Sequence, residues 1–552
     1  MVSTESFAIF AVLNLKTVIM RKIQFQVLLS VLLSILPMTI SAQTRFMVMS
    51  DMHVLDKSLF DNGKALSDYT AEENKVVEYS QELFDKAVSQ ILDKAVKPDF
   101  ILIPGDMSKD GEKVSHDHVV TGLKKLEEAG IKVYVAPGNH DINNPDAMSF
   151  LGSSQTKVAS ISADEFKSEA YYGNFGYAEA IETNGLSYLA YPTDKIAILS
   201  LDSHKPDTST EHHSEGGLTE ETLKWAESMA SKALASGRRV IGMMHHPIME
   251  HFDGHAQLEP TYIANSGSEY PKLANVQKRL VAAGIAVMFT GHFHLQSIAK
   301  VDTPAGALYD VMTGSLCAYP FRMRNATINE KEISINSEDV TISTSGKSLA
   351  ELGEERVESL TTNMFASLGE MMLPLMENMR LEFAEARWYK LVSWPGNSNE
   401  IREGTMKYMF NDFKRFVGDM AAGDEHLQDP QGNIKACTDG FENYFFSLFE
   451  GGDLVKKTMY KLIMDVVSNQ DAFKFMDQLT KSLFNNFTVN ESNVMTDNAN
   501  TVFLNGEPKD VGIESIASDS ADAPAYNLNG LRANANGEGF FIKDGKVMLR
   551  QK

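Results

Sequence analysis

Short apolar runs recur through the first three hundred residues and predict the strands of a sheet. They cover residues 46–49, 100–103, 133–136, 196–199, 240–244 and 286–289. Uninterrupted runs of this length are typical of strands with both faces buried. Between them, apolar residues recur at helical spacing over residues 72–96, 119–129, 219–235 and 271–283. Strands that alternate with helices predict an α/β core over residues 43–345.

The pattern changes near Gly346, after which the helical period predominates. Helices are predicted over residues 347–390, 401–422, 438–449 and 453–487. Their apolar stripes indicate a C-terminal all-α helical bundle over residues 346–490. The stripes are rich in Met and Phe, which we interpret as a packed core rather than a lipid or cofactor pocket. Residues 491–552 are predicted to be a polar tail that ends in a β-hairpin around Asp544 and Gly545.

Residues 1–42 have the pattern of an upstream extension and a signal peptide. Arg21 and Lys22 precede an apolar stretch over residues 27–36, and the small residues Ser41 and Ala42 follow it. This order is typical of a secretory signal, and the apolar stretch is shorter than the ~20 residues of a membrane span. We therefore expect export to the periplasm or the extracellular space, Met20 as the start of the precursor, and no transmembrane segment in the mature protein.

Length and charge narrow the classes of function. The 552 residues exceed what one hydrophobic core of about 250–300 residues supports, so we expect at least two domains. A net charge of −23 argues against a nucleic-acid polymer or an anionic membrane as the main partner. Cys317 and Cys437 could pair after export, but we favour two separate buried thiols.

Candidate metal ligands directly follow the predicted strands. They are Asp51, His53, Asp106, Asn139, His245, His292 and His294. All offer nitrogen or oxygen and none is a thiolate, which favours two transition metal ions such as Mn, Fe or Zn. Seven ligands are too many for one tetrahedral ion, and two ions that share a carboxylate would use them all. Paired ions of this kind clamp the attacking and leaving oxygens of a phosphoryl displacement.

In chain order, the ligands form the motifs D-x-H, G-D, G-N-H-D, H-H-P and G-H-x-H. This set resembles the calcineurin-like metallophosphoesterase family over about residues 46–319. The resemblance implies a layered core of β-sheets flanked by helices and a dinuclear centre. It assigns Asp51, His53 and His294 to one metal, and Asn139, His245 and His292 to the other, with Asp106 between them. It also implies that water activated by the metals is the nucleophile.

Four further residues, three of them in these motifs, are assigned roles beside the ligands. His140 is the catalytic residue that contacts the substrate phosphate, either to stabilise charge or to protonate the leaving oxygen. His246 orients neighbouring groups or contacts substrate. Asp141 and Asp202 either orient ligand imidazoles or serve as plain capping residues.

The stretch from Gly105 to Gly111 lacks the Asp-Arg-Gly of the Ser/Thr protein phosphatases. Other stretches, such as Asp61-Asn62-Gly63 and Gly216-Gly217-Leu218, resemble a bacterial cyclic-nucleotide phosphodiesterase branch that carries a helical bundle. Few cations lie near the motifs in sequence: Lys109, Lys113 and Lys205. We therefore expect a small-molecule, nucleotide-like phosphodiester as the substrate. The alternatives are a phosphomonoesterase or nucleotidase and, from another class, a binding module on an inactive scaffold.

Overall fold

The computed structural model describes most of the N-terminal half of the chain beyond residue 42. The described residues are 43–359, apart from 72, 207–209, 253–254, 256–259 and 330–331, together with 443, 446–452, 494–495, 501–503, 514–515, 526–527, 539–543 and 546–550. The predicted signal segment, most of the predicted bundle and Cys437 lie outside these residues. The chain divides into two compact units, Met1–Thr44 and Arg45–Lys552. The architecture below is that of the second unit.

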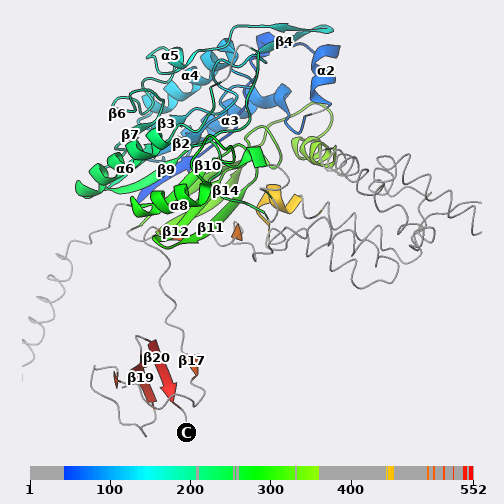
Figure 1. Cartoon of the computed structure of the whole chain (residues 1–552). Coiled ribbons are helices and arrows are strands. Elements are labelled where there is room, and N and C mark those ends of the chain that lie inside the picture. Colours follow the sequence, from blue (N-terminus) through cyan, green and yellow to red (C-terminus); the bar gives the residue numbers. More distant parts are fainter. Residues whose placement is uncertain are drawn as a thin grey trace, which may run out of the picture. The chain divides into compact units, whose positions relative to one another are not determined.

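Two sheets form the core (Figure 1). Among the described residues, one has six strands in the order β16-β14-β13-β1-β2-β3, and the other has eight in the order β15-β11-β12-β10-β9-β8-β7-β6. The first contains β1 (Thr44–Val48), β2 (Phe100–Pro104), β3 (Lys132–Ala136), β13 (Arg322–Ile328), β14 (Glu332–Asp339) and β16 (Thr501–Phe503). The second contains β6 (Ala180–Ile181), β7 (Tyr188–Ala190), β8 (Ile196–Ser200), β9 (Arg239–Met243), β10 (Ile285–Thr290), β11 (Ser297–Thr303), β12 (Gly306–Met312) and β15 (Val494–Met495).

Each sheet has a parallel centre, as the buried apolar runs predict. Strands β1, β2 and β3 are parallel neighbours, and so are β8, β9, β10 and β12. Parallel strands have their carboxyl ends at one edge of a sheet, where ligands commonly bind in open α/β folds. The strand-end residues of both sheets can therefore meet at one site.

Helices cover the outer faces of the two sheets, so the core has four layers (Figure 1). Helices α3 (Ser80–Leu92) and α4 (Lys113–Glu128) pack on the first sheet, and α6 (Glu220–Ala235) and α8 (Leu273–Ala282) pack on the second. Strand β8 shows why. Its residues Ile196 and Ile198 enter the core shared with the first sheet, whereas Ala197 and Leu199 enter the core beneath α6 and α8. Side chains of a strand alternate between its faces, so an uninterrupted apolar run fills both cores.

The prediction for α6 is confirmed at both ends. The hydroxyl of Thr219 accepts a hydrogen bond from the backbone N–H of Thr222 at 3.1 Å, which caps the first turn. Gly237, with φ of 80°, follows the end of the helix.

Two other helices differ from the prediction. Residues 72–96 were predicted as one helix, but α3 covers only Ser80–Leu92 and follows the short 3₁₀-helix η2 (Val77–Tyr79). The backbone N–H of Val76 instead donates to the carbonyl of Cys317 at 2.8 Å, which holds the preceding residues in an extended contact. Helix α4 begins six residues before the predicted start at residue 119, because its first turns are polar and mask the apolar period.

The stretch over residues 142–193 was predicted to be irregular, yet it contains β6, β7, the hairpin of β4 (Met148–Leu151) and β5 (Ser154–Lys157), and α5 (Ala163–Phe166). Strand β4 packs with the 3₁₀-helix η1 (Lys57–Leu59) and with α2 (Lys64–Thr70). The buried members of this satellite cluster are Leu55, Leu59, Ala65, Leu66, Val77 and Phe150. The cluster forms a small apolar layer beside the carboxyl end of β2.

Segments from the C-terminal half also contact the core. A helix over residues 349–359 buries Leu349 and Val357, and one over residues 446–450 buries Leu448 and Phe449. Strand β15 pairs with β11, and β16 pairs with β14. Val502 of β16 is fully buried in the main core. Part of the predicted polar tail therefore completes both sheets of the core.

At the C-terminus, β19 (Gly539–Lys543) and β20 (Lys546–Arg550) pair antiparallel where the sequence predicts a hairpin, in a four-stranded sheet with β17 (Glu514–Ser515) and β18 (Tyr526–Asn527). The rest of the predicted bundle lies outside the described residues. Within the described part of the chain, every helix is too short or too polar to span a bilayer.

Candidate metal centre

The loops after β1, β2 and β10 carry most of the predicted ligands in an uncommon backbone conformation. The φ angles are 49° for Asp51, 41° for His53, 52° for Asp106, 75° for His292 and 63° for His294. Residues other than glycine rarely adopt this left-handed region, which costs of order 1–3 kcal/mol each. Such residues persist where the surrounding structure enforces them, and they cluster at functional sites. The fold therefore turns these side chains sharply toward one point.

The first group of predicted ligands, Asp51, His53 and His294, is brought together by loops of both sheets. The Nε2 atoms of His53 and His294 lie 3.0 Å apart, and Nε2 of His294 lies 3.6 Å from Oδ1 of Asp51. Burial lowers the pKa of both imidazoles well below the ordinary value. Neutral imidazole is the form that binds a metal ion.

The second group contains Asn139, His245 and His292. Nε2 of His245 lies 2.8 Å from Oδ1 of Asn139 and 3.1 Å from Nδ1 of His292. The Nδ1–H of His245 donates to the carbonyl of Pro104 at 2.8 Å, which leaves Nε2 facing the other two residues. This backbone contact orients the ring as ligand imidazoles are oriented in metal sites.

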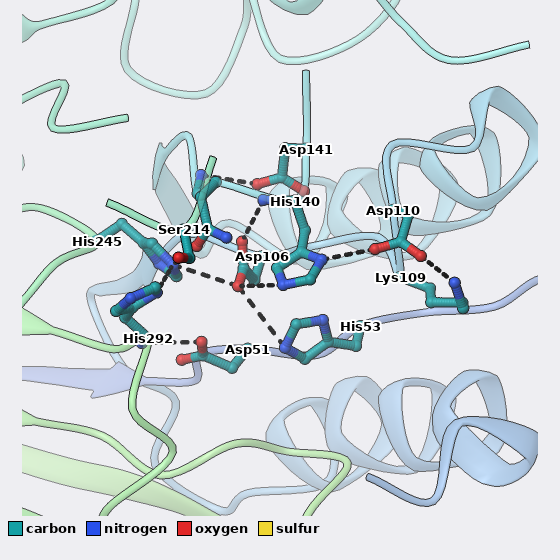
Figure 2. A network of polar contacts seen from close by, with 12 residues as sticks. Asp51, His53, Asp106, Lys109, Asp110, His140, Asp141, Ser214, His245 and His292 are labelled. Carbon is teal, nitrogen blue, oxygen red and sulfur yellow. Dashed lines mark hydrogen bonds and ion pairs between the residues drawn. The ribbon is translucent and has the colours of Figure 1, made fainter. Parts of the chain in front are cut away.

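Asp106 lies between the two groups (Figure 2). Its Oδ2 is 3.6 Å from Nε2 of His53 and 3.2 Å from Nε2 of His245. Burial alone would raise the pKa of Asp106, but His245 and His140 lower it well below the ordinary value. In turn, although burial opposes it, the Asp106 carboxylate raises the pKa of His245 to about 9. Asp106 is thus an ionised, buried carboxylate with one group of ligands on either side, as the prediction of a shared ligand requires.

The spacing of these atoms fits metal coordination. Nitrogen and oxygen ligands at about 2.0–2.1 Å from an ion lie about 2.9 Å apart in an octahedron and about 3.3 Å apart in a tetrahedron. Four of the six ligand distances above, from 2.8 to 3.2 Å, are close to these edges, and the other two, at 3.6 Å, are slightly longer. The residues present therefore fit two transition metal ions.

Three glycines make room for the ligands. A Cβ atom at Gly105 would lie 2.4 Å from Nδ1 of His245, and one at Gly138 would lie 2.1 Å from Oδ1 of Asp106. One at Gly291 would lie 2.2 Å from Oδ2 of Asp51. These distances are far shorter than van der Waals contact. The glycines of the G-D, G-N-H-D and G-H-x-H motifs are thus required by close approach.

Asp141 joins two of the ligand loops rather than orienting a ligand imidazole. Its Oδ1 accepts the backbone N–H groups of Met107 at 2.8 Å and Ser108 at 3.1 Å, and its Oδ2 accepts that of Gly138 at 2.8 Å. The capping alternative for this residue agrees with these contacts. Asp141 holds the loop after β2 against the loop after β3, which sets Asp106 beside Asn139.

The other two neighbours of the motifs lie on different sides of the centre. The ring of His246 packs against that of His292, with centroids 4.3 Å apart, and its Nδ1 lies 2.9 Å from Oγ of Ser203. Asp202 contacts the imidazole of His204 at 2.5 Å, so the imidazole it orients is not one of the predicted ligands. His246 is therefore next to the centre, whereas the side chain of Asp202 contacts His204 and the backbone of Leu186.

His140 lies beside the two groups of ligands, with Nε2 4.0 Å from Oδ2 of Asp106. Its Nδ1 lies 2.7 Å from Oδ1 of Asp110, so this nitrogen carries a proton and donates it to the carboxylate. Nε2 is left facing the centre (Figure 2). This geometry gives His140 a nitrogen suited to contact a substrate there.

Sequence reasoning missed two residues of the site. Asp110 was noted only within the stretch that lacks an arginine, although an acid four residues after Asp106 was a usable signal. His212 belongs to a His-His pair before a Gly-Gly pair, which is a weak signal. Its Nε2 lies 3.2 Å from Nδ2 of Asn139, and its ring centroid is 4.9 Å from that of His140.

The lysines that are near the motifs in sequence are all paired with carboxylates. Lys109 contacts Asp110, Lys113 contacts Glu165, and Lys205 contacts Glu215. Each of these three lysines would therefore have to share its charge between a carboxylate and a substrate phosphate.

Comparison with known proteins gives a family and distant relatives. The family model for Calcineurin-like phosphoesterase matches residues 44–296. A probable cyclic nucleotide phosphodiesterase of Psychrobacter arcticus is 30% identical over 93 residues, which are 17% of this chain and 31% of that protein. A probable glycerophosphodiester phosphodiesterase, GpdQ, of Arcobacter nitrofigilis is 29% identical over 161 residues, which are 28% of this chain and 46% of that protein. Each match spans less than half of the relative's own length.

Among solved structures, a dimetal phosphatase from Danio rerio aligns with 54% of this chain and 96% of its own, at 14% identity and a TM-score of 0.37. A purple acid phosphatase from yellow lupin (Lupinus luteus) aligns with 56% of this chain and 52% of its own, at 13% identity and a TM-score of 0.33. The family match spans the ligand motifs from Asp51 to His294, which converge on a single centre. Residues 44–296 of this chain therefore match the calcineurin-like phosphoesterase family, and the matched stretch contains the convergent ligand motifs.

Proposed function

We propose that this chain is a metal-dependent phosphodiesterase that hydrolyses a nucleotide-like diester at a dinuclear centre. The observation that carries the proposal is the position of Asp106, which lies between two convergent groups of ligand atoms. Asp51, His53 and His294 would hold one ion, and Asn139, His245 and His292 the other. Two bound cations would supply activated water and neutralise charge on the phosphoryl group. Mn, Fe or Zn suit this donor set.

His140 would act as the general acid. Its Nδ1–H is held by Asp110, and a protonated imidazole presents the Nε2–H toward the centre. Water adds its oxygen to phosphorus while the bond to the leaving oxygen breaks. The leaving oxygen takes the proton from Nε2, and the proton lost by the water restores the imidazole for the next turnover. The Asp110 carboxylate stabilises the charged ring before transfer.

The charge around the centre favours a diester over a monoester. A monoester dianion gains more from additional cations, because charge-assisted hydrogen bonds to its free oxygens are strong. The nearby Lys109, Lys113 and Lys205 are instead paired with carboxylates. The relatives in Psychrobacter and Arcobacter are both named as probable phosphodiesterases, which supports the same choice.

The test compares kcat/KM of the purified full chain for two diesters and two monoesters. The diesters are bis-nitrophenyl phosphate and a cyclic nucleotide, and the monoesters are nitrophenyl phosphate and a 5′-nucleotide, each with matched Mn, Zn or Fe. We expect the diesters to be preferred. A clear preference for the monoesters would identify a phosphomonoesterase or nucleotidase, and no turnover with any metal would indicate a binding module.

The role of His140 has its own test. His140→Ala should keep both metals and lose about 10²–10⁴-fold in kcat on a cyclic nucleotide, whose alkoxide leaving group needs a proton. The loss should be smaller on bis-nitrophenyl phosphate, because nitrophenolate leaves without protonation. An equal loss on both substrates would assign His140 to charge stabilisation instead.

The proposal also includes export. The segment over residues 1–42 supports a protein that acts in the periplasm or outside the cell on a small molecule. Fractionation of cells that express the full chain tests this, because a cytoplasmic product of full length would contradict it.

A further inference from the structure

Lys109 is a buried cation beside the proposed active site, and it is not one of the candidate metal ligands. Its side chain is 2% exposed. The ammonium lies over the ring of Tyr69 at 4.5 Å from the centroid and over that of Phe150 at 5.0 Å. A lysine with so little exposure needs compensation for its lost hydration. Two aromatic faces supply part of it through cation–π attraction.

The remaining compensation comes chiefly from the carboxylate of Asp110, whereas Glu112 lies farther from the ammonium. Lys109 forms an ion pair with Oδ2 of Asp110, and its ammonium is 4.0 Å from Oε1 of Glu112. The other oxygen of Glu112 accepts the backbone N–H of Asp110 at 2.9 Å. Burial by itself would raise the pKa of Asp110, but Lys109 and His140 together lower it below the ordinary value. Asp110 is thus an ionised carboxylate with a fixed partner on each oxygen.

The two oxygens of Asp110 link Lys109 to His140. Oδ2 contacts the ammonium, and Oδ1 accepts the Nδ1–H of His140 at 2.7 Å (Figure 2). A carboxylate with one oxygen fixed has little freedom to rotate, so the direction of its other oxygen is also fixed. The orientation of the His140 ring therefore depends on the position of Lys109.

We propose that Lys109 is a positioning residue that acts through Asp110 to aim Nε2 of His140 at the leaving oxygen, an inference that rests on the proposed function of His140. The satellite cluster, which includes parts of α2 and of the β4–β5 hairpin, contacts the Lys109 side chain. Tyr69 belongs to α2 and Phe150 to β4, and both pack in this cluster. The small layer over the carboxyl end of β2 thus excludes water from the ammonium and holds it beside Asp110.

The experiment is a mutant cycle in the full chain with Lys109→Met and His140→Ala. Lys109→Met should lower kcat on a cyclic nucleotide by about ten- to a hundredfold, the usual cost of losing a group that orients a functional side chain. KM should stay unchanged, and the loss on bis-nitrophenyl phosphate should be smaller. In the His140→Ala background, adding Lys109→Met should cause no further loss, because the residue acts only through His140.

Metal content and the thermal unfolding midpoint are measured for every variant. If Lys109→Met does not fold, the same cycle is run with Lys109→Gln, which keeps a polar head group without the charge. The matched control is Lys113→Met, which removes a lysine four positions along that is paired with Glu165 and 42% exposed. This control should retain wild-type kcat on both substrates.

A Lys109 variant that lowers kcat equally with and without His140 overturns the inference, because the residue would then act on the metals or the fold. Wild-type kcat in a folded Lys109→Met or Lys109→Gln variant also overturns it. Both outcomes leave the proposed function standing, since the wild-type chain and His140→Ala still report on that. A wild-type chain inactive on every phosphoester tested would instead refute the proposed function.

Discussion

Asp141→Asn tests the role that the structure gives to the buried carboxylate between the loops of Asp106 and Asn139. The wild-type side chain accepts three backbone N–H groups, two with Oδ1 and one with Oδ2. The asparagine amide has one oxygen and one NH₂ group of nearly the same size. Whichever way it faces, NH₂ meets at least one N–H group, so at least one hydrogen bond is lost without a cavity being made.

The expected cost follows from these contacts. A buried N–H group left without its acceptor costs about 1–3 kcal/mol, so the loss of one hydrogen bond should lower the free energy of unfolding by that amount. The loops after β2 and β3 should also separate more easily. We expect metal affinity to fall about ten- to a hundredfold, as for other residues that orient ligands.

The assay combines denaturant unfolding with competition against a chelator of known affinity. Asp202→Asn is the control, because the contacts of Asp202 are with His204 and the backbone of Leu186 rather than with the ligand loops. It should leave metal affinity unchanged. The reasoning is refuted if Asp141→Asn unfolds within about 0.5 kcal/mol of wild type, the range of neutral surface changes, and keeps its metals.

Three other changes give separate expectations. Asp106→Asn should lose both metals or the cooperativity between their binding, as measured by elemental analysis. A variant that keeps two metals and near-normal turnover would contradict the assignment of Asp106 as a shared ligand. Burial lowers the pKa of the His116 imidazole to about 3. Above pH 6.5 the ring is neutral in both the folded and the unfolded chain, so its contribution to stability is complete. As the pH falls toward 3 only the unfolded chain takes up the proton, and that stability is lost. His116→Gln should remove up to about 1.4 kcal/mol per pH unit from the slope of unfolding free energy over that window, and an unchanged slope would disprove it. A chain that ends at residue 345 lacks the buried Leu349 and Val502, each worth about 1.5–3 kcal/mol, so it should unfold at a clearly lower temperature. A wild-type midpoint would show that residues 346–552 do not stabilise the core.

The sequence by itself indicated which side chains are candidate metal ligands. Apolar runs such as those before Asp51 and Asp106 predict parallel strands, and parallel strands bring their carboxyl ends to one edge. Ligand residues at those ends therefore approach one another within each sheet, and the packing of the two sheets brings both sets to one centre. The glycines beside them are also visible in the sequence, but the reason for each, such as the close approach of Gly138 to Asp106, lies in the tertiary structure.

The tertiary structure decided what the neighbouring residues do. Asp110 and Lys109 are adjacent in sequence, but their effect on His140 depends on the burial of Lys109 under Tyr69 and Phe150, about 40 residues away in either direction. Such contacts leave no periodic signal, because they join loops rather than faces of helices or strands. The same holds for Val502, which lies in a stretch that reads as polar yet fills the core beside β14. Local patterns specify strands and their ends, whereas long-range packing decides which charge is buried and what it touches.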